Sequence, residues 1–233
     1  MIAENSGVMD GAAEKLTENE APQVRLPTHE IVYRKLREQI LFGEIAPGQP
    51  VTIQGLTARL DAGMTPVREA IRRLTAEGAL KFQGNRRVIV PLLTSQDIEE
   101  VIVIRQCLEA QMAERAAQRA TDSAVQVLTE LDDLLDAAIT RGDLTAYLEY
   151  NYRFHTQIYA MAEAPILADL AEGLWLRFGP SLRVVCGRVG TQNLPDKHKE
   201  LLTALKSGDA AAASKANLDD MMQGMTQVRE MLR

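Results

Sequence analysis

Three arginines lie within the stretch MTPVREAIRRL, residues 64–74. At helical spacing, Thr65, Arg68 and Arg72 fall three and four residues apart on one face. The planar guanidinium group of arginine can donate two parallel hydrogen bonds to guanine O6 and N7 in the major groove of DNA. The spacing of these side chains therefore predicts a helix whose outer face can approach nucleic acid.

The rest of this helix is predicted to pack on its own protein. Thr65 is expected to cap the helix, with Pro66 at the first helical position, where its missing N–H costs nothing. The positive end of the helix would then face phosphates. The alternative is an ordinary solvated helix in which Glu69 pairs with Arg73. In both cases one apolar stripe faces the interior: Val67, Ala70, Ile71 and Leu74.

A second group of polar residues lies far along the chain. Asn151 and His155 are one helical turn apart, His198 opens another helical pattern, and Asp220 follows 22 residues later. Two imidazoles and a carboxylate that converge inside a helical bundle would suit a divalent transition metal. Spacing this loose is equally compatible with hydrogen-bonded structural histidines.

The elements that would position the arginines follow a recognisable order. Amphipathic patterns predict helices over 28–43, 53–60 and 65–77. Two β-like stretches, 79–83 and 86–92, follow and are joined through a Gly-Asn turn. Helix, helix, helix and hairpin is the order of a winged helix-turn-helix, whose helix after the turn enters the major groove.

The second half reads as six helices without a strand signal, which predicts an all-α antiparallel bundle. The third of these helices is expected to end at Ala164, because Pro165 disfavours helical geometry in the residue before it. The protein is therefore expected to be mainly α, with three parts: a disordered acidic tail (1–24), a winged helix-turn-helix (25–92) and a helical domain (93–233). The expected helices span about 95–119, 121–142, 143–164, 166–187, 195–207 and 209 to the C-terminus.

Charge is divided unevenly along the chain. The formal net charge is −6, yet residues 25–91 carry +5 and residues 92–233 carry −7. Such asymmetry is a hint of nucleic-acid binding. Cys107 and Cys186 belong to no paired motif, so a reducing cytoplasm is the expected location. No apolar run approaches the roughly 18 residues of a membrane span, and no membrane association is expected.

The motif TPVREAIRRL…EG, within residues 52–92, resembles the DNA-binding domain of the GntR family of bacterial transcription regulators. The resemblance implies DNA contacts by the third helix and the wing. Gly63 and Met64 stand where that family commonly has Ser-Arg, and Gln54 replaces an upstream arginine, which puts the usual operator sequence in doubt. The implied DNA-binding residues, with Arg72 added from the helix spacing, are Thr65, Arg68, Arg72, Gly84, Asn85 and Arg86.

Residues from about 95 to 225 resemble the FCD effector-binding domain of the FadR-like branch of the same family. The resemblance places Asn151 at an aspartate ligand position, His155 and His198 at two histidine positions, and Asp220 at a third. It also places a pocket arginine at Arg105, for which the alternative role is an intrahelical pair with Glu109.

Two of the four implied ligand positions differ in type from the family pattern. Asp220 can still ligate through oxygen, whereas Asn151 offers only a neutral carbonyl. Two expectations remain open. Either His155, His198, Asp220 and Asn151 bind a zinc-, nickel- or manganese-like divalent ion weakly, or Asn151, His155 and His198 bind an effector directly with Arg105.

The preferred hypothesis is a ligand-responsive regulator, most often a repressor in this family. It would bind a palindromic double-stranded operator as a homodimer and sense a small organic acid in its helical domain. The competing hypothesis is a helical-bundle metalloenzyme with a site of two histidines and one carboxylate. The sequence lacks the Glu-x-x-His repeats of di-iron bundles and the GxSxG, HExxH and phosphate-loop motifs.

Overall fold

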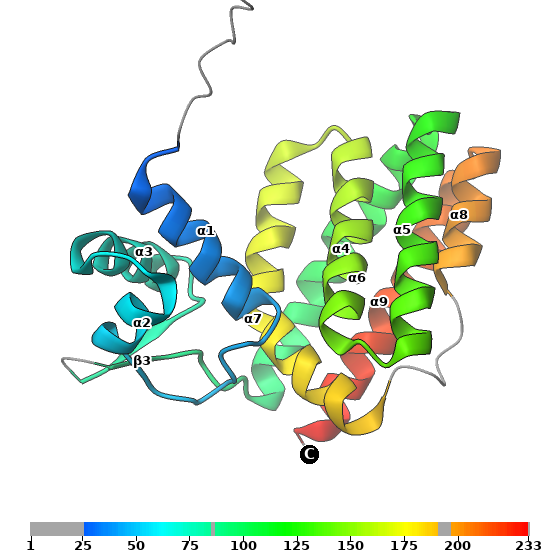
Figure 1. The fold of residues 1–233 in the computed structure, drawn as a ribbon. Coiled ribbons are helices and arrows are strands. Elements are labelled where there is room, and N and C mark those ends of the chain that lie inside the picture. The colour runs from blue at the N-terminus through cyan, green and yellow to red at the C-terminus, as the bar shows by residue number, and fades with distance from the viewer. Residues whose placement is uncertain (1–25, 85–86, 191–196, 233) are drawn as a thin grey trace, which may run out of the picture.

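The computed structural model describes residues 26–84, 87–190 and 197–232, which form an N-terminal half and a helical half (Figure 1). The predicted tail of residues 1–24 lies outside the described residues. The N-terminal half contains α1 (Thr28–Leu41), β1 (Val51–Thr52), α2 (Ile53–Leu60), α3 (Met64–Ala76), β2 (Lys81–Gln83) and β3 (Arg87–Ile89).

The N-terminal half has the predicted order of three helices and a hairpin. β3 lies between β1 and β2 and is antiparallel to both, with Val88 opposite Val51 and Phe82. β1 was not predicted, because a strand of two residues is too short to show alternation. The three helices enclose an apolar core: Val32, Leu36, Ile40, Leu56, Val67, Ile71 and Leu74.

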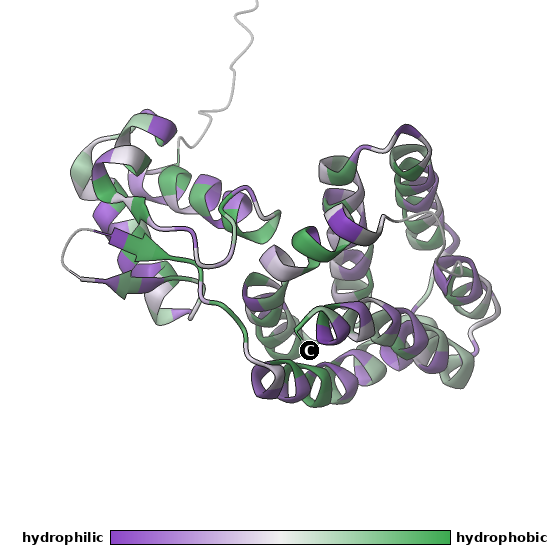
Figure 2. Cartoon of the chain, turned by 90° about the horizontal axis from the view of Figure 1, so that it is seen from below, coloured by the Kyte–Doolittle hydropathy of each residue, from purple (hydrophilic) through white to green (hydrophobic). Residues whose placement is uncertain are grey.

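The described part of the helical half contains six helices, as predicted. The two-residue link between α5 and α6 makes these two helices antiparallel neighbours. Figure 2 shows hydrophobic and hydrophilic segments alternating along these helices, as expected for helices with one buried face. Their bounds are α4 (Ser95–Gln118), α5 (Asp122–Arg141), α6 (Leu144–Met161), α7 (Pro165–Val189), α8 (Lys197–Ser207) and α9 (Ala210–Met231).

Side-chain caps begin several of these helices. Thr94 and Asp97 form a reciprocal capping box at the start of α4, in which each side chain accepts a hydrogen bond from the backbone N–H of the other. Thr121 accepts from the N–H of Ala124 at the start of α5. Gly142 ends α5 in the left-handed conformation. These caps agree with the helix starts predicted near residues 95 and 121 and with the end predicted at 142.

Two predicted helix boundaries are wrong. α3 begins at Met64 with Gly63 as its N-cap, so Thr65 is already inside the helix and does not cap it. α6 ends at Met161, before the expected Ala164, because Glu163 takes a left-handed conformation with φ of 50° and turns the chain ahead of Pro165.

α7 joins the two halves, because α1 lies against it (Figure 1). Arg37 of α1 donates to Glu172 of α7 at 2.9 Å and contacts the Tyr152 hydroxyl at 3.4 Å. At Gly179 the two backbones approach so closely that an added Cβ would lie 2.7 Å from the carbonyl oxygen of Leu41. Only glycine allows this approach.

Gly179→Ala is expected to destabilise the protein by about 1–3 kcal/mol, as overpacking of a close contact does. Gly173→Ala is the matched control, because a Cβ at Gly173 of the same helix would meet no atom within 4 Å. That control is expected to stabilise α7 by about 0.5–1 kcal/mol, since alanine favours helix over glycine. Urea unfolding of both variants measures the difference, and equal midpoints would contradict the close contact.

Candidate nucleic-acid interface and metal centre

The outer face of α3 is exposed, as the sequence predicted. Its apolar stripe is buried, while the side chains of Thr65, Arg68 and Arg72 are exposed. Arg72 pairs with Glu69 at 2.8 Å, and both side chains are at least half exposed. A surface ion pair of this kind is worth little and is easily exchanged for another partner. Both arginines are therefore available to an approaching ligand.

Arg73 belongs to a different environment. It pairs with Glu30 of α1 at 3.0 Å and with Glu77 at 3.2 Å. Its guanidinium also lies 3.6 Å from the ring centre of Tyr33. The alternative pair between Glu69 and Arg73 does not form, because Arg73 pairs with Glu30 of α1 and with Glu77.

The hairpin lies beside this helix-turn-helix core. Gly84 follows β2 with φ of 68°, a left-handed conformation that glycine adopts without strain. Asn85 and Arg86 lie outside the described residues. Arg87, the first residue of β3, is exposed.

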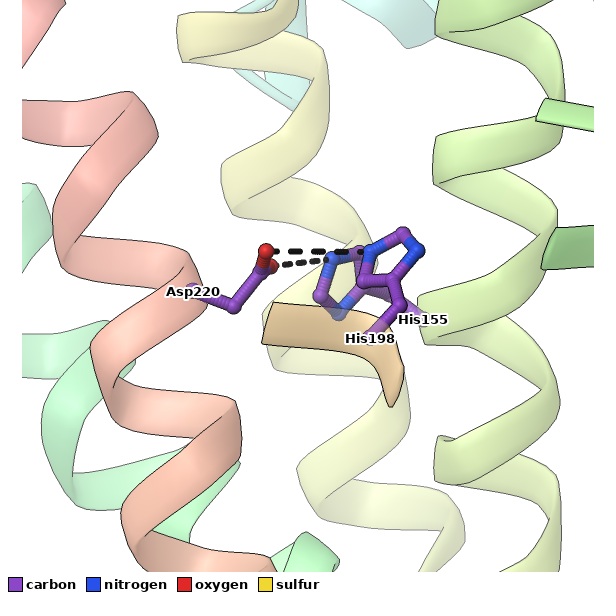
Figure 3. A group of neighbouring side chains, drawn as sticks. All are labelled: His155, His198 and Asp220. Carbon is purple, nitrogen blue, oxygen red and sulfur yellow. Dashed lines mark ion pairs between the residues drawn. The ribbon is translucent and has the colours of Figure 1, made fainter. Parts of the chain in front are cut away.

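In the helical half, three predicted metal ligands converge from three different helices. Figure 3 shows His155 of α6, His198 of α8 and Asp220 of α9 pointing toward one another. His155 Nε2 lies 3.1 Å from Asp220 Oδ2, and His198 Nε2 lies 3.7 Å from Asp220 Oδ1. One ligand atom from each residue lies within 4.8 Å of the others, and these are the nitrogen and oxygen donors that divalent transition metals accept.

Asp132 of α5 supports this group and was missed by the sequence analysis. Its Oδ1 lies 3.0 Å from Nδ1 of His198, and both side chains are buried. A proton on Nδ1 would leave the lone pair of Nε2 directed at Asp220, which is the carboxylate–histidine arrangement of metal sites. A signal was present in the sequence, because Asp132 follows Leu128 by four residues on the apolar stripe of its helix.

The carboxyl group of Asp220 is held in its charged form. Burial alone would raise its pKa, but the neighbouring His198, a hydrogen bond from His155 and the Arg105 charge lower the pKa to about 2. The Nδ1 atom of His155 is buried and has no hydrogen-bond partner among the described residues. His155 thus lacks the outer partner that Asp132 gives to His198.

A cavity of about 40 Å³ adjoins two of the three residues, and Arg105, Asn151, His155 and Asp220 all line it. Arg105 Nε donates to Glu109 Oε1, both side chains are buried, and the guanidinium lies 4.3 Å from the ring centre of Phe178. Burial lowers the pKa of Arg105, but the Glu109 carboxylate outweighs it and the net shift is upward. The predicted pocket position of Arg105 and its alternative, the Glu109 pair, are therefore both present.

Carboxylates surround the candidate ligands. Glu109 pairs with Arg105, Asp132 with His198, and Asp220 lies within 4 Å of both imidazoles. Buried charges are costly unless they are compensated. A divalent cation held by His155, His198 and Asp220 would offset the charge of the buried carboxylates, so the residues present fit such an ion.

A winged helix-turn-helix joined to a helical bundle with an internal polar site defines a class of transcription regulator. The model of the gntR family of bacterial regulatory proteins matches residues 28–90, and the FCD domain model matches residues 100–222. The chain belongs to the GntR family and carries an FCD domain. It is a transcription regulator rather than an enzyme, so the metalloenzyme hypothesis is wrong.

Relatives of known designation agree with this assignment. The chain is 29% identical over 197 residues to the HTH-type transcriptional regulator McbR of Escherichia coli, covering 83% of this chain and 89% of the relative. It is 26% identical over 208 residues to the HTH-type transcriptional repressor RspR of the same organism, covering 88% and 91%.

Solved structures show the same architecture. The structure of E. coli McbR/YncC matches with a TM-score of 0.84 at 27% identity, over 90% of this chain and 100% of that one. A putative GntR regulator from Rhodococcus matches with a TM-score of 0.74 at 23% identity, over 88% and 99%, and this likeness supports the fold alone. None of the described helices combines the length and apolar character needed to cross a membrane.

Proposed function

We propose that the chain is a ligand-responsive repressor that binds a palindromic DNA operator as a homodimer. The observation that carries this proposal is the outer face of α3, where Arg68 and Arg72 are exposed next to a hairpin. Exposed arginines at the start of such a helix can contact base edges and phosphates in the major groove. Thr65, Gly84, Asn85 and Arg86 are proposed to share this contact.

The distribution of charge supports the same orientation. The +5 segment of residues 25–91 would face the phosphates, and the −7 segment of residues 92–233 would face away from them. Each neutralised phosphate releases counterions, so affinity is expected to fall steeply as salt rises.

Apolar side chains on the surface of the helical half support a dimer. Val103 and Ile104 of α4 are 58% and 44% exposed, and Ile166 and Leu170 of α7 are 76% and 55% exposed. α4 and α7 pack against each other. Exposed apolar groups of this kind are typical of protein interfaces, and a two-fold dimer would place two α3 helices about one DNA turn apart.

The site in the helical half is proposed to sense a small organic acid with the help of a metal. His155, His198 and Asp220 would hold a zinc-, nickel- or manganese-like ion, and the carbonyl of Asn151 would add a weaker ligand. The bound ion would supply positive charge for a carboxylate. Arg105 would add to this attraction once the effector competes with Glu109 for its guanidinium.

Arg68→Ala is expected to weaken operator binding at least about fivefold, since a bidentate contact between arginine and guanine is worth about 1–3 kcal/mol. Fluorescence anisotropy at fixed salt, with the DNA duplex selected from a randomised pool by the wild-type protein, measures the change. Arg153→Ala is the matched control, because it removes the same charge from an exposed position on α6 in the helical half.

The proposal requires a difference between these two variants. If Arg68→Ala and the wild type bound the duplex with equal affinity, and if that affinity did not change with salt concentration, α3 would not be part of the DNA interface. Loss of binding in Arg153→Ala as large as that in Arg68→Ala would point to a general charge effect.

A further inference from the structure

The first residue of α3 is apolar and faces solvent. Met64 is 47% exposed, whereas the apolar stripe of the same helix, Val67, Ala70, Ile71 and Leu74, is buried in the N-terminal core. Gly63 before it has an extended backbone and no side chain to cover it. A large apolar group at the end of a DNA-facing helix is costly to leave in water and gains affinity if a partner covers it.

The exposed side chains of α3 form two rows. Met64, Arg68 and Arg72 follow one another at intervals of four residues, so they lie along one side of the helix. Thr65, Glu69 and Arg73 form the other row.

The second row faces α1. Thr65 and Glu69 line a surface hollow together with Thr28 and His29 at the start of α1. Arg73 continues this row and pairs with Glu30 of the same helix. The row that begins at Met64 therefore lies farther from α1 than the row of Thr65, Glu69 and Arg73, although both rows are exposed.

We propose that Met64 determines operator specificity by contacting the 5-methyl group of a thymine. This inference rests on the proposed operator binding by α3. The thymine methyl is the apolar group that a base pair presents in the major groove, and apolar side chains recognise it by direct contact. Met64 and Arg68 are separated by a rise of about 6 Å along the helix, so the thymine lies within about two base pairs of the base that Arg68 reads.

Replacement of thymine by uracil tests this contact, because uracil lacks only the methyl group. The wild-type protein selects duplexes from a randomised pool, and each thymine of the selected half-site is then replaced in turn. Uracil at one position is expected to weaken binding about fourfold, the value for burial of one methyl-sized group, and about 15-fold when both half-sites are changed. Met64→Ala is expected to bind the thymine and uracil duplexes equally.

Ile31→Ala is the matched control, because Ile31 is an exposed apolar residue of α1 outside the row that begins at Met64. This control is expected to keep the full difference between thymine and uracil. If uracil at no position changed wild-type binding, the assignment of Met64 would be overturned while operator binding would stand. The same would follow if uracil weakened binding of Met64→Ala as much as it weakens binding of the wild type. Failure to select any duplex would overturn operator binding and, with it, the role of Met64.

Discussion

Glu109→Leu is expected to lower the free energy of unfolding by about 3–5 kcal/mol, because it leaves the buried guanidinium of Arg105 without its counter-charge. Glu109 has no exposed surface, and Arg105 is 3% exposed. Urea unfolding followed by fluorescence measures the loss. Trp175 is the only tryptophan of the chain, and its ring centre lies 5.1 Å from the Arg105 guanidinium, so its emission reports on this region.

Removal of both charges separates the ion pair from packing. The double variant Arg105→Met with Glu109→Leu is expected to recover most of the lost stability, because well-packed apolar groups often replace a buried ion pair at little cost. A double variant as unstable as Glu109→Leu alone would show that shape, rather than charge, accounts for the loss.

Zinc is expected to bind the chelator-treated protein with one ion per chain, and Asp132→Asn is expected to weaken that binding about 10- to 100-fold. Asp132 does not belong to the proposed ligand set, but its carboxylate orients His198 and makes that imidazole a stronger donor. Asp220→Asn is expected to weaken binding further, since it removes the anionic ligand itself. Isothermal titration with zinc and with nickel measures these affinities.

The matched control for this series is Asp136→Asn. Asp136 lies one turn after Asp132 on α5, but it is exposed and pairs with Lys199 at 2.8 Å. Its loss is expected to leave metal affinity unchanged. Equal affinities in the wild type, Asp132→Asn and Asp220→Asn would place the ion elsewhere and leave the polar cluster to bind an effector directly.

Local patterns were sufficient to predict most of the fold. The apolar stripes gave the helices of both halves, and the Gly-Asn turn located the hairpin. Predicted helix boundaries were wrong where the conformation of a single residue determines the end of the helix. Glu163 adopts a left-handed conformation that non-glycine residues seldom take, and Gly63 displaces Thr65 from the cap position.

The candidate site was only partly predictable. Residue types suggested His155, His198 and Asp220 as a group, and only the family resemblance supported it further, because these residues come from helices whose packing no local pattern specifies. Asp132 was missed because it lies 66 residues before His198. Other acidic residues, Glu130 and Asp133, lie beside it, so the sequence alone does not single it out. Which row of α3 lies farther from α1 could not be predicted either, because it follows from the pair between Arg73 and Glu30, a tertiary contact.

The size of the cavity has a consequence for how a signal could reach DNA. Binding sites for small molecules commonly measure about 300–1,000 Å³, whereas this cavity measures about 40 Å³. A guest larger than a few water molecules would therefore have to move the side chains or helices that surround the cavity. Trp175, Phe178 and Cys186 line the cavity, and Gly179 of the same helix touches Leu41 of α1. If the domain binds an effector as proposed, its entry would move α7, the helix against which α1 of the DNA-binding half packs, and this shared helix would link the two binding equilibria.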